Sequence, residues 1–105
     1  MNSYLASLLL THFICNAQAA VQPVSPEEAL RCSRNFETLK FYLHPQMTSA
    51  EAAKMSSAQR AKKSVEAYAF YVAWKKANPE LVAHLKETSD RIIRNPQDSA
   101  EPGRF

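Results

Sequence analysis

Glycine is almost absent from this chain of 105 residues, since the only one is Gly103 near the C-terminal end. This scarcity excludes the GxGxxG and GxxxxGK[ST] turns that hold phosphates in nucleotide-binding folds. Asn-Gly and Asp-Gly turns are missing as well, and so are alternating runs of β-branched residues. Strand signals are therefore nearly absent, and the sequence predicts an all-α fold.

The length and composition favour one small globular domain. The chain has 46% hydrophobic and 22% charged residues, which is typical of a folded protein. Its formal net charge is +3. That excess is small beside the dense basic patches of nucleic-acid-binding proteins, so we expect no nucleic-acid partner.

Charged residues are missing from the N-terminal segment. The run from Tyr4 to Cys15 is uncharged and mostly apolar, and Ala17-Gln18-Ala19 follows it with the small-x-small pattern that signal peptidase reads. We predict a cleavable signal peptide at residues 1–19, cut between Ala19 and Ala20, in a periplasmic or secreted protein. The alternatives are an amphipathic first helix of a cytosolic protein and a membrane anchor. The apolar run is about twelve residues, short for a span, and we expect no transmembrane span in the mature chain.

Cysteine occurs only twice, at positions 15 and 32. Cleavage would remove Cys15 and leave Cys32 as a lone thiol in an oxidising compartment. Such a thiol is buried, paired between chains or reactive. The position of Cys32 in the middle of an apolar helical stripe favours burial, an interchain disulfide is the second interpretation, and a reactive thiol served by His44 or His84 is the third.

Prolines and capping residues divide the mature chain into helices. After an extended linker at residues 20–24, Ser25-Pro26-Glu27-Glu28 has the pattern of a capping box, and it opens a helix that ends before His44-Pro45. A second capping box at residues 48–51 opens a segment running to residue 77, and Asn78-Pro79 opens a third helix that ends at Asn95-Pro96.

Residues 25–95 are therefore expected to form a small up-down-up three-helix bundle. A four-helix bundle is the alternative if the middle segment breaks near Ser56-Ser57. Residues 96–105 are polar and lack an apolar period, so we predict a disordered tail.

The middle helix carries the candidate binding surface, which consists of Arg60, Lys63, Phe70, Tyr71 and Trp74. Cations that precede aromatic residues on one side of a helix suit an anionic amphiphile, a membrane surface or an acidic partner helix. Core packing is the alternative, because a central helix contacts two neighbours and needs a wide apolar arc.

No catalytic, cofactor or metal site is predicted. We expect an exported, non-enzymatic binding or protein-interaction module whose partner is another protein or a second copy of this chain, with Leu30 and Phe41 as one candidate dimer surface. The alternative is a carrier that holds a small apolar or anionic ligand between its helices, in a cavity lined by Phe36, Tyr68 and Trp74.

Overall fold

The computed structural model describes residues 2–95, which contain five α-helices and no strand. The helices are α1 (Ser3–Val21), α2 (Pro26–Leu43), α3 (Ser49–Lys54), α4 (Ser57–Ala77) and α5 (Pro79–Arg94). The all-α prediction is confirmed, and the three-helix count is wrong. The tail predicted at residues 96–105 lies outside the described residues.

One of the two additional helices comes from a break in the predicted middle segment. The Oγ of Ser56 accepts a hydrogen bond from the backbone N–H of Gln59 at 3.2 Å, and the side chain of Gln59 accepts one from the N–H of Ser56 at 2.9 Å. This capping box starts α4 afresh, because a serine that bonds the backbone locally competes with a continuous helix. The break lies where the four-helix alternative placed it.

The other additional helix is α1, which contains the predicted signal peptide and folds as a full helix of 19 residues. The Oδ1 of Asn2 accepts a hydrogen bond from the N–H of Leu5 at 2.7 Å and so caps the start of α1. No acidic residue lies in its first turn and no basic residue in its last. The stability of α1 therefore depends on the neighbours that cover its apolar face.

Most of the predicted helix boundaries agree with the structure. Ser25 and Glu28 form the expected capping box, with distances of 3.1 and 3.2 Å, and α2 ends at His44 before the proline. Asn78 differs in its role, because its Nδ2 donates to the carbonyl of Trp74 at 2.8 Å and makes no side-chain bond at the start of α5. Asn78 thus closes the end of α4, while Pro79 opens α5.

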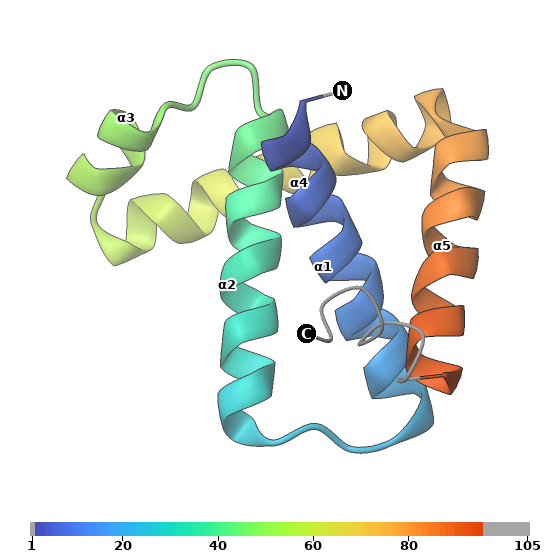
Figure 1. Ribbon diagram of the computed structural model, residues 1–105. Coiled ribbons are helices and arrows are strands. Elements are labelled where there is room, and N and C mark those ends of the chain that lie inside the picture. The colour runs from blue at the N-terminus through green and yellow to red at the C-terminus, as the bar shows by residue number, and fades with distance from the viewer. Residues whose placement is uncertain (1, 96–105) are drawn as a thin grey trace.

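The arrangement of the helices centres on α1 (Figure 1). α1 lies between α2 and α5, runs antiparallel to α2, and packs extensively against both. α4 crosses one end of this layer and packs against α2, whereas α4 and α5 make few contacts beyond their junction. Consequently α5 is attached to the rest of the fold mainly through α1.

The core confirms the central position of α1. This helix contributes Leu8, Leu9, His12 and Phe13 to the buried residues, more than any other helix. Leu9 and Leu39 of α2 are completely buried. Because buried apolar side chains supply most of the stability of a small domain, the fold of residues 2–95 depends on a segment predicted to be removed.

We predict that Phe36→Ala destabilises the protein. Phe36 of α2 is half-buried, and its ring stacks on the ring of His12 and meets the ring of Tyr71 edge-on. The expected loss in the free energy of unfolding is about 3 kcal/mol, the lower end of the range for a truncated aromatic. Urea unfolding measures it. Leu30→Ala is the matched control, because Leu30 lies on the same helix and is 51% exposed. Equal losses in the two variants would show that Phe36 is not a core residue.

Candidate functional site

The surface that α1 covers is an apolar groove formed by three other helices. We call it the α1 groove. Its side chains are all members of the core cluster or packed against it: Phe36, Leu39, Leu43, Tyr71, Trp74, Leu81, Val82 and Leu85. α2 supplies one wall, α5 supplies the other, and α4 contributes the two large aromatic residues at one end. The groove is therefore the size and shape of one helix.

Polar contacts also join α1 to its groove. Nε2 of His12 lies 2.9 Å from the hydroxyl of Tyr71 and 3.3 Å from Nδ2 of Asn16. Because the Asn16 amide nitrogen only donates, Nε2 acts as the acceptor and the Tyr71 hydroxyl donates to it. Nδ2 of Asn35 on α2 donates to the backbone carbonyl of Leu8 at 3.0 Å. These contacts fix the register of α1 along the groove.

Burial keeps the His12–Tyr71 pair uncharged. The pKa of His12 is lowered to about 4, mainly by burial and to a smaller extent by the nearby Lys75 ammonium. Burial, with the neighbouring Tyr68, raises the pKa of Tyr71 to about 12. The ammonium of Lys75 lies 4.8 Å from the centre of the Tyr71 ring. At neutral pH the pair is thus a neutral hydrogen bond, with a cation over the tyrosine ring.

A disulfide bond connects α1 to the N-terminal half of α2. Cys15 and Cys32 are bonded, with their Cα atoms 5.9 Å apart, and no free cysteine is found among the described residues. The prediction of a lone thiol at Cys32 is therefore wrong for the uncut chain, in which Cys32 is bonded to Cys15. Sequence reasoning had assigned Cys15 to the removed segment. An interchain role for Cys32 requires that Cys15 be lost first.

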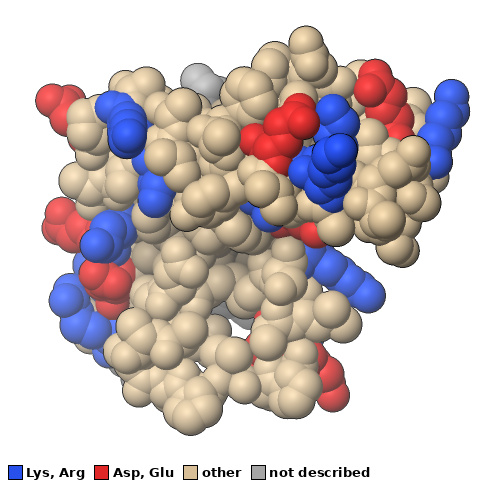
Figure 2. Space-filling model, turned by 180° about the vertical axis from the view of Figure 1, so that it is seen from behind, with Lys and Arg blue, Asp and Glu red and all other residues tan. Residues whose placement is uncertain are grey.

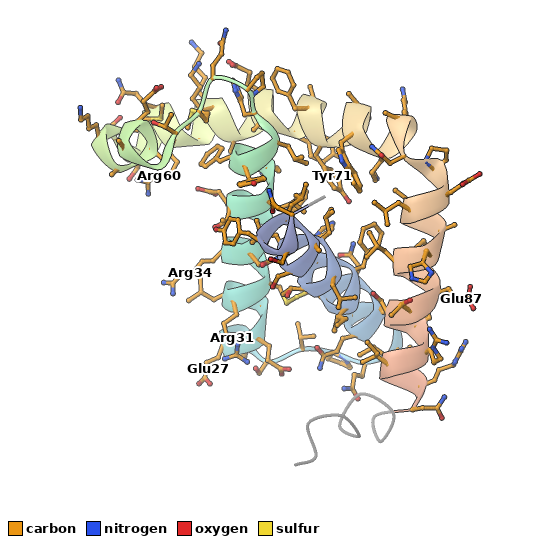
Figure 3. The ribbon with its side chains drawn as sticks, turned by 45° about the horizontal axis from the view of Figure 1, so that its top comes forward. Glu27, Arg31, Arg34, Arg60, Tyr71 and Glu87 are labelled. Carbon is orange, nitrogen blue, oxygen red and sulfur yellow. A yellow bond between two sulfur atoms is a disulfide. The ribbon has the colours of Figure 1, made fainter. Side chains whose placement is uncertain are left out.

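The cations of the predicted binding surface make contacts within the chain. Arg60 is tied to α3, since its Nη2 donates to the carbonyl of Ala52 at 2.8 Å. Lys63 forms an ion pair with Glu66 at 3.3 Å. Figure 3 shows Arg60 at the corner between α3 and α4, while Tyr71 points from α4 toward α1.

Glu66 also binds the buried His44. Nδ1 of His44 accepts a hydrogen bond from the N–H of Gln46, so Nε2 carries the proton that is donated to Glu66 at 2.7 Å. The bonds from His44 and then Lys63 lower the pKa of the Glu66 carboxyl. Phe70 lies against the His44 ring and is 37% exposed. Both nitrogens of His44 are occupied, and it anchors the end of α2 to α4.

The structure thus separates the five predicted surface residues. Tyr71, only 3% exposed, and the half-buried Trp74 belong to the α1 groove. Arg60 instead bonds α3, Lys63 pairs with Glu66 on its own helix, and Phe70 packs against His44 at the end of α2. Sequence reasoning missed the residues of α1 that meet the groove. The signal for them was present, because Leu5, Leu8, Leu9, His12 and Phe13 share one helical face.

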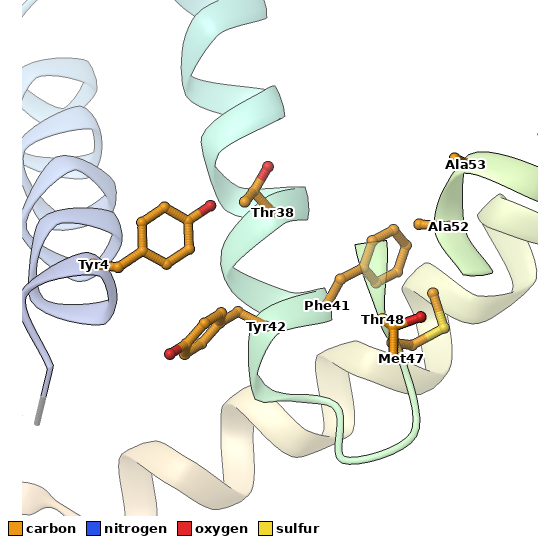
Figure 4. A pocket seen from close by; sticks show the side chains of 8 residues that line it. All are labelled: Tyr4, Thr38, Phe41, Tyr42, Met47, Thr48, Ala52 and Ala53. Atoms are coloured by element: carbon orange, nitrogen blue, oxygen red, sulfur yellow. The ribbon is translucent and has the colours of Figure 1, made fainter. Parts of the chain in front are cut away.

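A separate hollow of about 690 Å³ lies where α1 begins, α2 ends and α3 packs (Figure 4). Tyr4, Thr38, Phe41, Tyr42, Met47, Thr48, Ala52 and Ala53 line it, and none of them is charged. Phe36 does not line this hollow, because its ring packs directly against Tyr68 and Tyr71. We expected a cavity lined by Phe36, Tyr68 and Trp74, but in the structure the Phe36 ring packs against the rings of Tyr68 and Tyr71.

The exterior of the described residues shows an uneven distribution of charge. Seen from behind, Lys, Arg, Asp and Glu gather over the upper part, where α3 and α4 run, and along the α5 edge (Figure 2). Uncharged surface fills the lower middle of this face. Among residues 2–95 no group of three or more His, Cys, Asp or Glu is placed to hold a metal ion.

α1 is also the one helix in the described part of the chain that is long and apolar enough to cross a membrane, judged by length and composition. Core helices and signal sequences share this character, so it does not distinguish between them. The chain matches no protein-family model, no curated protein and no solved structure.

We predict that the protein becomes less stable as the pH falls, because the unfolded chain protonates His12 more readily than the folded protein does. Its pKa is about 4 in the folded protein, against an ordinary value of 6.5, so between these values the unfolded chain binds more protons. The free energy of unfolding therefore decreases as the pH falls from about 7 to about 5, above the range where most carboxylates titrate. Denaturant unfolding at each pH measures the slope.

Two variants identify the residue responsible for this slope. His12→Phe keeps an aromatic ring against Phe36 and removes the titrating group, so the decrease should become much smaller. His84→Gln is the matched control because His84 is exposed on α5. An unchanged slope in H12F would contradict the assignment.

Proposed function

We propose that this protein is an exported, non-enzymatic interaction module that binds a helix of a partner protein in the α1 groove. The observation that carries the proposal is the position of α1: the segment with the signal-peptide pattern is the helix that fills the groove. Removal of residues 1–19 would uncover a contiguous apolar surface. Such surfaces mark interaction sites, and a groove of this shape suits an amphipathic helix.

The contacts of α1 indicate the chemistry of the partner. The helix should carry large aliphatic or aromatic side chains where Leu8, Leu9 and Phe13 lie, because these residues are buried in the structure. It should place a hydrogen-bond acceptor opposite the hydroxyl of Tyr71, as His12 does. α1 has no charged residue, and an apolar helix with few charges is therefore the expected partner.

Export is supported by two features. Ala17-Gln18-Ala19 precedes an exposed peptide bond at the end of an uncharged apolar helix. Cys15 and Cys32 form a disulfide bond, and disulfides persist in oxidising compartments. Both features fit a chain that reaches the periplasm or the exterior of the cell.

The binding test uses residues 20–105 and a labelled synthetic peptide of residues 2–19 as the helix probe, with Cys15→Ser and Cys32→Ser to exclude disulfide exchange. We expect the peptide to bind and to increase the helix content of residues 20–105, because it restores the core. Fluorescence anisotropy and circular dichroism measure the two effects. A chain 20–105 with unchanged helicity and no affinity for the peptide would contradict the proposal.

A matched pair of peptides tests the mode of binding. Leu9→Asp places a carboxylate at a fully buried position and should lower the affinity by more than about tenfold, or about 1.4 kcal/mol. Ser7→Asp introduces the same group at an exposed position of α1 and should have little effect. Equal losses would mean that the peptide binds in another way.

A carrier of a small apolar ligand is the second candidate, and the hollow lined by Tyr4, Phe41 and Tyr42 favours it. Its volume of about 690 Å³ is within the range of small-molecule sites, and its lining is uncharged. This candidate predicts that an apolar fluorescent probe binds to the full chain. Ala52→Trp should then abolish binding by filling the hollow, while Ala58→Trp, exposed on α4, should preserve it.

A further inference from the structure

We propose that the Cys15–Cys32 disulfide retains α1 in its groove after the chain is cut between Ala19 and Ala20, so that reduction opens the groove to a partner. The inference rests on the proposed function of the α1 groove and concerns its regulation. It makes the mature protein a two-chain molecule, in which the cut signal helix is the occupant of the binding site until the disulfide is reduced.

The positions of the two bonds carry the proposal. The cut lies between Cys15 and Cys32 in the sequence, so the disulfide bridges the two products. In the uncut chain α1 is joined to α2 by two covalent routes, the linker at residues 22–25 and the disulfide. Hydrolysis of the peptide bond breaks only the first route. After the cut, residues 1–19 therefore remain attached to the rest of the protein through the disulfide.

The peptide bond can be reached from outside the core. Ala19, Ala20 and Val21 are exposed in the last turn of α1, whereas the buried residues of this helix end at Phe13. Only the last turn has to unwind for a peptidase to bind it. The buried contacts of Leu8, Leu9 and His12 with the groove persist through the cut, and they hold the two cysteines together.

The disulfide is accessible to a reductant from two sides. Both cysteines are half-buried, and each of two shallow hollows on the surface is lined by both of them. One hollow also includes Glu28 and Arg31, and the other includes His12 and Asn16. A disulfide that a reductant can reach from the surface is more readily reduced than one enclosed in the core, and regulatory disulfides are of the accessible kind.

The two covalent steps balance. In the first, water adds across the Ala19–Ala20 peptide bond and produces a carboxylate and an amine. In the second, a dithiol reductant transfers two electrons and two protons to the disulfide. The Cys15–Cys32 bond breaks, both residues become thiols, and the reductant acquires a disulfide.

Each restraint by itself keeps the groove closed. A helix tethered by a short linker or by a disulfide has an effective concentration of about a millimolar at its own site. A partner helix present at about a micromolar, with the same intrinsic affinity, therefore competes at a disadvantage of about 10³-fold. When both the peptide bond and the disulfide are broken, α1 is diluted into solution and the disadvantage disappears.

The first experiment examines the protein as it is secreted. The full chain is expressed in an exporting host, its thiols are blocked during purification, and its intact mass is measured before and after reduction. We expect the mass of residues 1–105 plus one water before reduction, and separate masses for residues 1–19 and 20–105 afterwards. Residues 20–105 alone before reduction, or an uncut chain, would overturn the proposal.

The matched variant Cys15→Ser separates the disulfide from the noncovalent contacts. Its cut chain should lose residues 1–19 on gel filtration without any reductant, while the parent chain retains them. Because this variant can also fail to fold before it is cut, a second form that keeps both cysteines makes the test decisive. A recognition sequence for a site-specific protease is inserted between Gln22 and Pro23 of the full chain, which is cut after it has folded.

This nicked protein allows the opening of the groove to be measured directly. The probe is the labelled peptide of residues 2–19 with Cys15→Ser. With an effective concentration of about a millimolar for the tethered α1 and an intrinsic Kd of about a micromolar, we expect the probe to bind about 10³-fold more tightly to the reduced protein, once the released α1 has been removed, than to the oxidised protein. Equal affinity in the two states would overturn the control of the groove by the disulfide.

The outcomes also separate this proposal from the function on which it rests. Retention of residues 1–19 with equal probe affinity in the two states refutes gating and leaves the groove as a binding site. An absence of probe binding in both states overturns the proposed function, and the gating proposal with it.

Discussion

The packing of α1 between α2 and α5 is the interaction on which the rest of the structure depends. Leu9 of α1 is completely buried, and Leu8 and Phe13 pack beside it in the cluster that holds Leu39 and Leu85. α5 contacts α4 little beyond their junction, so without α1 it has no substantial neighbour. A chain of this size has no second core to compensate, because small domains bury too little surface. The integrity of the fold and the availability of the groove are thus two consequences of one contact.

Most helix boundaries could be predicted because they depend on local chemistry. Ser25 with Glu28, and the prolines at positions 26, 45 and 79, act within one turn of the backbone, and a single sequence displays such signals. The role of α1 could not be predicted in the same way. An uncharged apolar run serves equally as a signal sequence or as a core helix, and only the neighbours distinguish the two. The pairing of Cys15 with Cys32 was missed for the same reason.

The candidate surface on α4 shows what helical periodicity leaves out. Arg60 and Tyr71 are eleven residues apart, so at 100° per residue they lie on nearly the same side of the helix. They are also about 16 Å apart along the axis, and this distance places them on different neighbours. Arg60 binds the carbonyl of Ala52 in α3, and Tyr71 binds His12 in α1. A helical projection gives the direction of a side chain but not the element that meets it.

The hydrogen bond between His12 and Tyr71 bears on the proposal that a partner helix replaces α1. In a permanent core an apolar pair would serve as well, because a neutral buried hydrogen bond adds only about 1 kcal/mol net. When α1 leaves, however, water can satisfy the Tyr71 hydroxyl, whereas an occupant lacking an acceptor would bury it unpaired at a cost of about 1–3 kcal/mol. If a partner helix binds as proposed, the pair would add little to its affinity and would decide mainly which helix binds and in which register. In the proposed binding mode, a helix without an acceptor opposite Tyr71 would be disfavoured by this penalty, and the groove would discriminate between helices in that way.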